Sequence, residues 1–258
     1  MTDDLEGAGY EVDFMPITDL VWGKGFITPG GEGNVDRIVE GVDLNGKRVL
    51  ELGSGAGGGT LVLASKYGAN VVGLELEAPL VELSRQNARD AGLSDKIEFR
   101  CVEPGPLPVE SASFDVFYTS GVICHIEDRL SLFRDVLRVL KPGGMLLGYD
   151  WFPTRLSDDI NSWMKAAGLH LFPDSPENYA KWMREAGFED VNHFDASDWY
   201  QNRAAEELEE LTGPLFDKAA EVTSEEVRDS IINEWRAMNL VLQSGELRSG
   251  YFRGRKPT

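Results

Sequence analysis

Residues 48–59 of this 258-residue chain read Arg-Val-Leu-Glu-Leu-Gly-Ser-Gly-Ala-Gly-Gly-Gly. The short apolar run predicts a buried strand, and the glycines that follow predict a tight turn before a helix. Glycines at such a turn let the backbone approach a ligand closely, because no Cβ stands in the way. The stretch therefore predicts a strand–loop–helix unit that binds a ligand.

Outward from this unit, short apolar strands alternate with amphipathic helices. We expect strands at residues 48–52, 71–75, 97–102, 114–118, 145–151, 191–194 and 251–255. We expect helices at 33–42, 79–91, 129–140 and 176–186. This alternation predicts an α/β fold, a Rossmann-like and mostly parallel seven-stranded sheet flanked by helices.

Two segments lie outside the alternating pattern. Residues 1–44 are expected to form an N-terminal lid or helical segment, and residues 45–258 the main domain. Residues 199–243 are rich in Glu and read as helical, without a strand. We expect this stretch to be a helical insertion near the C-terminus that caps the site.

The glycine loop alone is compatible with two ligands. Gly53, Gly55 and Gly58 satisfy the dinucleotide pattern GxGxxG, and Glu75 lies at a suitable distance to bind a ribose. An NAD-dependent oxidoreductase is therefore one alternative.

Charge separates the two ligands. Glu51, Glu75 and Glu103 each lie at or just after the end of a predicted strand, where open α/β sheets bind ligands. A carboxylate two residues before the first glycine repels a pyrophosphate but suits S-adenosylmethionine (SAM), which carries a sulfonium and an ammonium. Glu75 is then placed to accept hydrogen bonds from both ribose hydroxyls, and Glu103 from the adenine amino group.

The run from Val49 to Trp151 resembles the class I SAM-dependent methyltransferases. The similarity rests on the glycine loop, the acid that ends Val-Val-Gly-Leu-Glu, and Leu-Lys-Pro-Gly-Gly before the fifth strand. It implies SAM as the cofactor and methyl transfer to a small molecule, although a SAM-binding protein without catalytic activity is an alternative. The cofactor-binding residues it implies are Glu51, Gly53, Gly55, Gly57, Glu75, Leu76, Glu103, Pro104 and Ser120.

Two further segments resemble the phosphoethanolamine N-methyltransferases. These are residues 22–31, Trp-Gly-Lys-Gly-Phe-Ile-Thr-Pro-Gly-Gly, and residues 121–126, Gly-Val-Ile-Cys-His-Ile. The resemblance implies that His125 is the catalytic base, whereas a structural reading makes it a helix cap or a core contact. His170 and His193 lie outside these motifs, so we expect no comparable placement for them.

The chain departs from that subfamily at the residues that bind the substrate. Gly121 replaces an Asp, Phe26 aligns near a Tyr, and Trp163, Ala167 and Leu169 stand where further Tyr and Arg residues bind the phosphate. The resemblance therefore implies an apolar, aromatic acceptor pocket in place of a phosphobase site. The residues expected to line this pocket are Trp22, Phe26, Gly121, Trp151 and Trp163.

Composition limits the partners. Lys and Arg number 25 against 44 Asp and Glu, a formal net charge of −19 that disfavours nucleic acids and anionic membranes, although a salt-adapted source produces the same balance. Cys101 and Cys124 are expected to be reduced, buried thiols, and no residue spacing suggests a metal site. The acidic N-terminus and the lack of a long apolar run predict a cytoplasmic protein. Nothing in the sequence predicts the oligomeric state.

Overall fold

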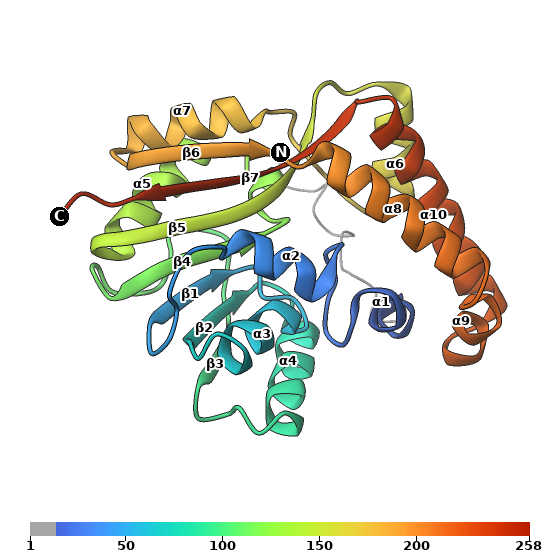
Figure 1. Cartoon of the computed structure of the whole chain (residues 1–258), viewed down its shortest axis with the longest axis horizontal. Coiled ribbons are helices and arrows are strands. Elements are labelled where there is room, and N and C mark those ends of the chain that lie inside the picture. The colour runs from blue at the N-terminus through green and yellow to red at the C-terminus, as the bar shows by residue number, and fades with distance from the viewer. Residues whose placement is uncertain (1–13) are drawn as a thin grey trace.

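A seven-stranded sheet forms the centre of the computed structural model, which describes residues 14–258 (Figure 1). The strand order is β3-β2-β1-β4-β5-β7-β6. Six of these strands run in the same direction, and β7 runs in the opposite direction between β5 and β6. The strands are β1 (Arg48–Leu52), β2 (Asn70–Glu75), β3 (Ile97–Cys101), β4 (Phe114–Ser120), β5 (Leu140–Pro153), β6 (Glu189–Asp195) and β7 (Leu247–Arg255). The predicted Rossmann-like, mostly parallel sheet is confirmed.

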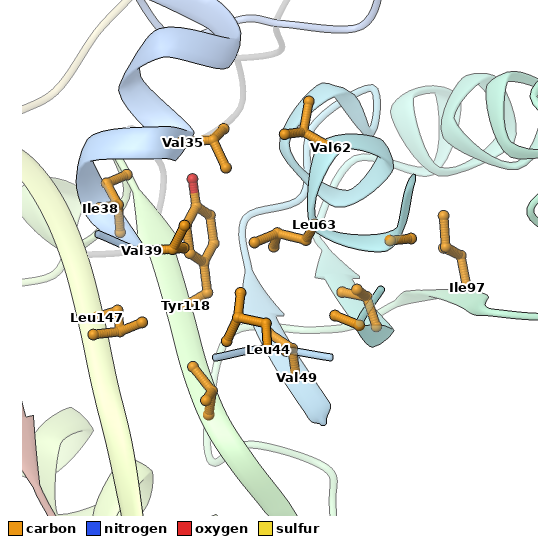
Figure 2. Close-up of a cluster of buried hydrophobic side chains, with 14 of the residues drawn as sticks. Val35, Ile38, Val39, Leu44, Val49, Val62, Leu63, Ile97, Tyr118 and Leu147 are labelled. Atoms are coloured by element: carbon orange, nitrogen blue, oxygen red, sulfur yellow. The ribbon is translucent and has the colours of Figure 1, made fainter. Parts of the chain in front are cut away.

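Helices cover both faces of the sheet. On one face, apolar side chains of α2 (Gly31–Ile38), α3 (Gly58–Ser65) and α4 (Ala78–Asp90) pack against the strands, as Figure 2 shows around Tyr118 and Leu147. On the other face, α5 (Arg129–Val139) and α7 (Pro176–Ala186) supply the core. Alternate residues of each strand point to opposite faces, so Val49 joins the first core and Leu50 the second.

A third hydrophobic core lies beyond the sheet edge. It joins α1 (Met15–Trp22), α6 (Asp158–Ala166), α8 (Ser197–Thr212), α9 (Phe216–Val222) and α10 (Glu225–Gln243), which lie together on one side of the molecule (Figure 1). The helical content expected for residues 199–243 is present as three helices. The helices are interrupted at Gly213 and at Ser224, whose side chain accepts a hydrogen bond from Val227 N–H and begins α10.

The structure differs from the sequence-based expectations at several places. Helix α6 was not expected, whereas α1 lies within the segment 1–44 that was expected to be a lid or helical, and β5 begins at Leu140 rather than at 145. Cys101 is exposed instead of buried, although both cysteines are free. The part of the expected lid that spans residues 1–13 lies outside the described residues. Within residues 14–258, no helix is long and apolar enough to cross a membrane.

Candidate active site

A cavity of about 1080 Å³ lies at the carboxyl ends of β1, β2 and β4, where the strand order reverses direction. Open α/β sheets bind their ligands at such a switch point. The predicted site residues that line this cavity are Phe26, Glu51, Gly53, Glu75, Leu76, Glu103, Pro104, Ser120, Gly121 and His125. The fold therefore brings together residues that are up to about a hundred positions apart in the sequence.

Glu51 is a buried carboxylate at the wall of this cavity. Its side chain shares a face of β1 with Val49 and accepts a short hydrogen bond from the Thr60 hydroxyl of α3. Within residues 14–258 no cationic side chain pairs with it. Burial raises the pKa of Glu51 to about 8, while the Thr60 hydrogen bond lowers this pKa and the nearby Glu75 charge raises it. A ligand cation at this wall would supply the missing positive charge.

Glu75 organises the glycine loop. Its Oε2 accepts a hydrogen bond from Gly55 N–H at 2.8 Å, and its Oε1 accepts from Leu76 N–H at 2.7 Å and Glu77 N–H at 3.2 Å. Gly55 has a φ of +52°, in the left-handed region that glycine adopts without strain. The predicted ribose-binding carboxylate thus also fixes the loop that cradles the ligand.

The remaining predicted cofactor residues occupy the two sides of the loop. Gly57 has a left-handed backbone and precedes α3, but neither it nor Gly55 lines the cavity itself. Leu76 lies at the cavity with 53% of its surface exposed, beside the equally open Glu103 and Pro104. An exposed leucine beside a carboxylate offers an apolar surface and a hydrogen-bond acceptor, which suits an adenine ring.

Residues 25–28, which belong to the segment 1–44 expected to form a lid, line the cavity. The carbonyl of Gly25 accepts a hydrogen bond from Gly58 N–H at 3.0 Å, and its own N–H donates to Asp19 Oδ1 at 2.8 Å. At the other end, Thr28 reaches Gly121, where a Cβ would lie 2.8 Å from Thr28 Cγ2. This segment therefore fills the space that a side chain at position 121 would need. Thr28 and Thr60 were not predicted as site residues. Thr28 meets Gly121 from a distant segment, and Thr60 contacts Glu51 across the glycine loop, nine residues away.

His125 ends a 3₁₀ turn, Ile123–His125, after β4. Its Nδ1 lies 2.7 Å from the backbone carbonyl of His170. A carbonyl can only accept, so Nδ1 carries the proton and Nε2 keeps a free lone pair. Burial lowers the pKa of His125 and keeps the ring neutral at pH 7. The expectation for His170 is corrected, since this residue also lines the cavity; His193 lies on β6.

The assignment of three tryptophans to the pocket is also corrected. Trp22, Trp151 and Trp163 do not line the cavity and instead belong to the core shared with the helical insertion. Trp163 is 1% exposed and packs edge-on against Trp151 at 5.5 Å, while Trp22 packs on Trp235 at 5.0 Å. Their indoles fill the space between the sheet edge and the insertion, a layer that the sequence did not reveal.

The fold and the site define an α/β domain built to bind a ligand that carries a cation and a ribose. Residues 50–148 match the methyltransferase domain family. A phosphoethanolamine N-methyltransferase of Triticum aestivum is 31% identical over 98% of this chain and 50% of its own length. The 27-O-demethylrifamycin SV methyltransferase of Amycolatopsis mediterranei is 26% identical over 94% of this chain and 90% of its own.

The solved structures show the same fold. The phosphoethanolamine N-methyltransferase 2 of Haemonchus contortus, bound to phosphomonomethylethanolamine and S-adenosylhomocysteine, superposes with a TM-score of 0.87 at 22% identity, over 95% of this chain and 57% of that one. Residues 50–148 thus form a methyltransferase domain, and the chain as a whole has the fold of proteins solved with SAM or S-adenosylhomocysteine bound. It spans about half the length of the plant relatives it matches.

The residues present fit SAM on the evidence of the site itself. The buried Glu51 carboxylate lacks a cation among the described residues, and an ammonium would provide one. The glycine loop leaves room for close backbone approach, and Glu75 lies beside it.

The role of Glu75 can be tested by substitution. Glu75→Ala removes the proposed ribose acceptor and the carboxylate that holds Gly55, so SAM affinity should fall tenfold or more, about 1.4 kcal/mol. Calorimetric titration measures this, with Glu82→Ala on the exposed side of α4 as the matched control. An unchanged affinity in Glu75→Ala would remove this residue from the cofactor site.

The buried Glu51 predicts a proton linkage. Because the folded-state pKa of Glu51 is about 8, the carboxyl is mostly protonated at pH 7 without a ligand, and an ammonium should displace the proton. SAM binding at pH 7 should therefore release close to one proton, and the affinity should rise between pH 6 and 8. Because this pKa lies above the ordinary value of 4.5, the ligand-free protein should lose stability as pH rises from about 4.5 to about 8, and this contribution should stay constant at higher pH.

Calorimetry in buffers of different ionisation enthalpy counts the released proton. The Glu51→Gln variant should bind SAM more weakly and release none at pH 7. Equal proton release by wild type and Glu51→Gln would assign the linkage to another group.

Proposed function

We propose that this chain transfers a methyl group from SAM to a small-molecule acceptor by in-line displacement, with His125 as the base. The observation that carries the proposal is one cavity lined both by a buried carboxylate that needs a cation and by a neutral imidazole with a free Nε2. SAM, when bound, supplies a methyl group on an electrophilic sulfonium. The protein holds the reactants in line and excludes water, effects worth roughly 7–11 kcal/mol.

His125 removes a proton where the acceptor atom carries one. The carbonyl of His170 fixes the ring tautomer, and burial keeps the pKa of His125 below its usual range, so the base is ready at neutral pH. A thioether or an activated carbon would need no such help. The acceptors favoured here are accordingly hydroxyl or amine groups.

Charge supports SAM over a dinucleotide. Among the cavity-lining residues that the structure describes, the Arg and Lys side chains are those of Arg134 and Arg138 on α5. Arg138 is committed to Asp135 at 2.5 Å and to the carbonyls of Leu107 and Val109. The glycine loop faces carboxylates instead, which disfavours a pyrophosphate. The net charge of −19 likewise supports a small-molecule acceptor over a nucleic acid, and the two free cysteines agree with a cytoplasmic location.

The acceptor side of the cavity leads to a prediction about phosphobases. Thr28, Gly121 and Leu169 line it, and none of them carries a positive charge that could form an ion pair with a phosphate dianion. Phosphoethanolamine should therefore be a poor substrate, despite the similarity to enzymes that carry its name. Steady-state assays would compare it with an acceptor identified by incubating metabolite extracts with labelled SAM. Efficient turnover of phosphoethanolamine would contradict this assignment of the pocket.

His125→Ala tests the proposed base. With the acceptor found in that screen, kcat should fall about 100-fold or more while SAM affinity stays within twofold of wild type. The wild-type rate should also fall as pH drops through the lowered pKa of His125. His193→Ala, on β6, is the matched control and should leave kcat unchanged. An unaltered kcat in His125→Ala would keep the methyltransferase and discard the base.

A further inference from the structure

Asp150 is a fully buried carboxylate in β5, next to the turn that carries His125. Its Oδ2 accepts hydrogen bonds from Cys124 N–H at 2.8 Å and from the Tyr179 hydroxyl at 3.2 Å. Its Oδ1 accepts from Trp151 N–H at 3.0 Å. Both oxygens therefore serve as acceptors, and the carboxylate is hydrogen-bonded to the backbone N–H of Cys124, the residue immediately before His125.

A second set of contacts joins this turn to the segment that follows α6. Phe172 N–H donates to the Cys124 carbonyl at 2.9 Å. Arg129 donates to the Phe172 carbonyl at 3.0 Å and to the Tyr179 hydroxyl at 3.3 Å, and forms a buried ion pair with Asp174 at 3.3 Å. Buried hydrogen bonds and a buried ion pair thus hold the turn beside residues 170–174.

These contacts converge on the imidazole. The His170 carbonyl that meets His125 Nδ1 belongs to the segment fixed by Arg129, and Cys124 N–H belongs to the turn fixed by Asp150. The distance of 2.7 Å between the ring and that carbonyl depends on both anchors. Asp150 itself does not line the cavity, so any effect on the site would act through these contacts.

We propose that Asp150 is the positioning residue for His125: by holding Cys124 N–H, it aims the ring so that Nδ1 donates to the His170 carbonyl and Nε2 stays free toward the cavity. The proposal rests on the proposed function only in that His125 is the base. The need for a carboxylate follows from the donors around it. An Asn side chain has one oxygen, so Asp150→Asn would turn an NH₂ group toward an N–H donor, at nearly unchanged volume.

Burial has a consequence for the charge state of Asp150. Removal from water raises its pKa to about 6, and the hydrogen bonds from Cys124, Trp151 and Tyr179 lower it. The carboxylate form that the three donors need is therefore lost as pH falls through about 6.

The direct test observes the His125 ring, without an acceptor. Imidazole ¹⁵N and ¹³C NMR of the full chain with bound S-adenosylhomocysteine, assigned with His125→Ala, reports tautomer and titration of the three histidines. Wild type should show His125 as the Nδ1–H tautomer with a depressed pKa. Asp150→Asn should show mixed tautomers and a pKa moved back toward 6.5. Identical His125 signals in wild type and in folded Asp150→Asn would overturn the proposal.

Two further variants keep the test decisive. Asp115→Asn is the matched control. Asp115 lies near the amino end of β4, away from His125, where it accepts a hydrogen bond from Arg48 N–H at 2.9 Å and pairs with Lys141. It should leave the His125 signals unchanged. Tyr179→Phe removes one donor to Asp150 and should cause a smaller shift of the same kind, which covers the case in which Asp150→Asn fails to fold.

A double-mutant cycle separates this proposal from the proposed function. With the screened acceptor, Asp150→Asn should lower kcat tenfold or more in wild type, with SAM affinity unchanged, but less than twofold in a His125→Ala background. Equal losses in both backgrounds would mean a general structural role and overturn the proposal. If His125→Ala itself leaves kcat unchanged, the base assignment fails, and the NMR comparison alone decides whether Asp150 positions the ring.

Discussion

A carboxylate buried near the carboxyl end of β1 must either stay protonated or face a positive charge, and the site is arranged around that requirement. Glu51 lies on the α3 face of β1, where Thr60 provides a hydrogen bond but no charge. The neighbouring carboxylate, Glu75, is occupied by three backbone N–H groups of the loop region. A cationic ligand completes this arrangement, whereas a phosphate would worsen it.

The sheet determines what else reaches the ligand. The order β3-β2-β1-β4 places the ends of four parallel strands in sequence along one edge, so that Glu75, Glu51 and Ser120 line one cavity. Residues 25–28 contact this edge through Gly25 and Thr28. The turn after β4 then brings His125 to the same cavity, held by buried contacts from β5 and from residues 170–174.

The sequence predicted what depends on local pattern. Strand–helix alternation predicted the sheet, and the Gly53–Gly59 stretch predicted the turn between β1 and α3. Helix α5 ends at Val139, close to the expected end, but Pro142 and the two glycines after it belong to β5. The helix α6 was missed although Ser157 caps it and two acids fill its first turn, signals that could have been used. The misplaced Trp151 and Trp163 belong to packing between segments distant in sequence, which periodicity does not encode.

The charges that line this cavity suit a cationic adenosine cofactor and not a dinucleotide. Titrating the unmodified chain with SAM and, separately, with NADH under one set of conditions distinguishes the two ligands. We expect SAM to bind and NADH neither to bind nor to displace it. Binding of NADH together with no binding of SAM would make this a dinucleotide site instead.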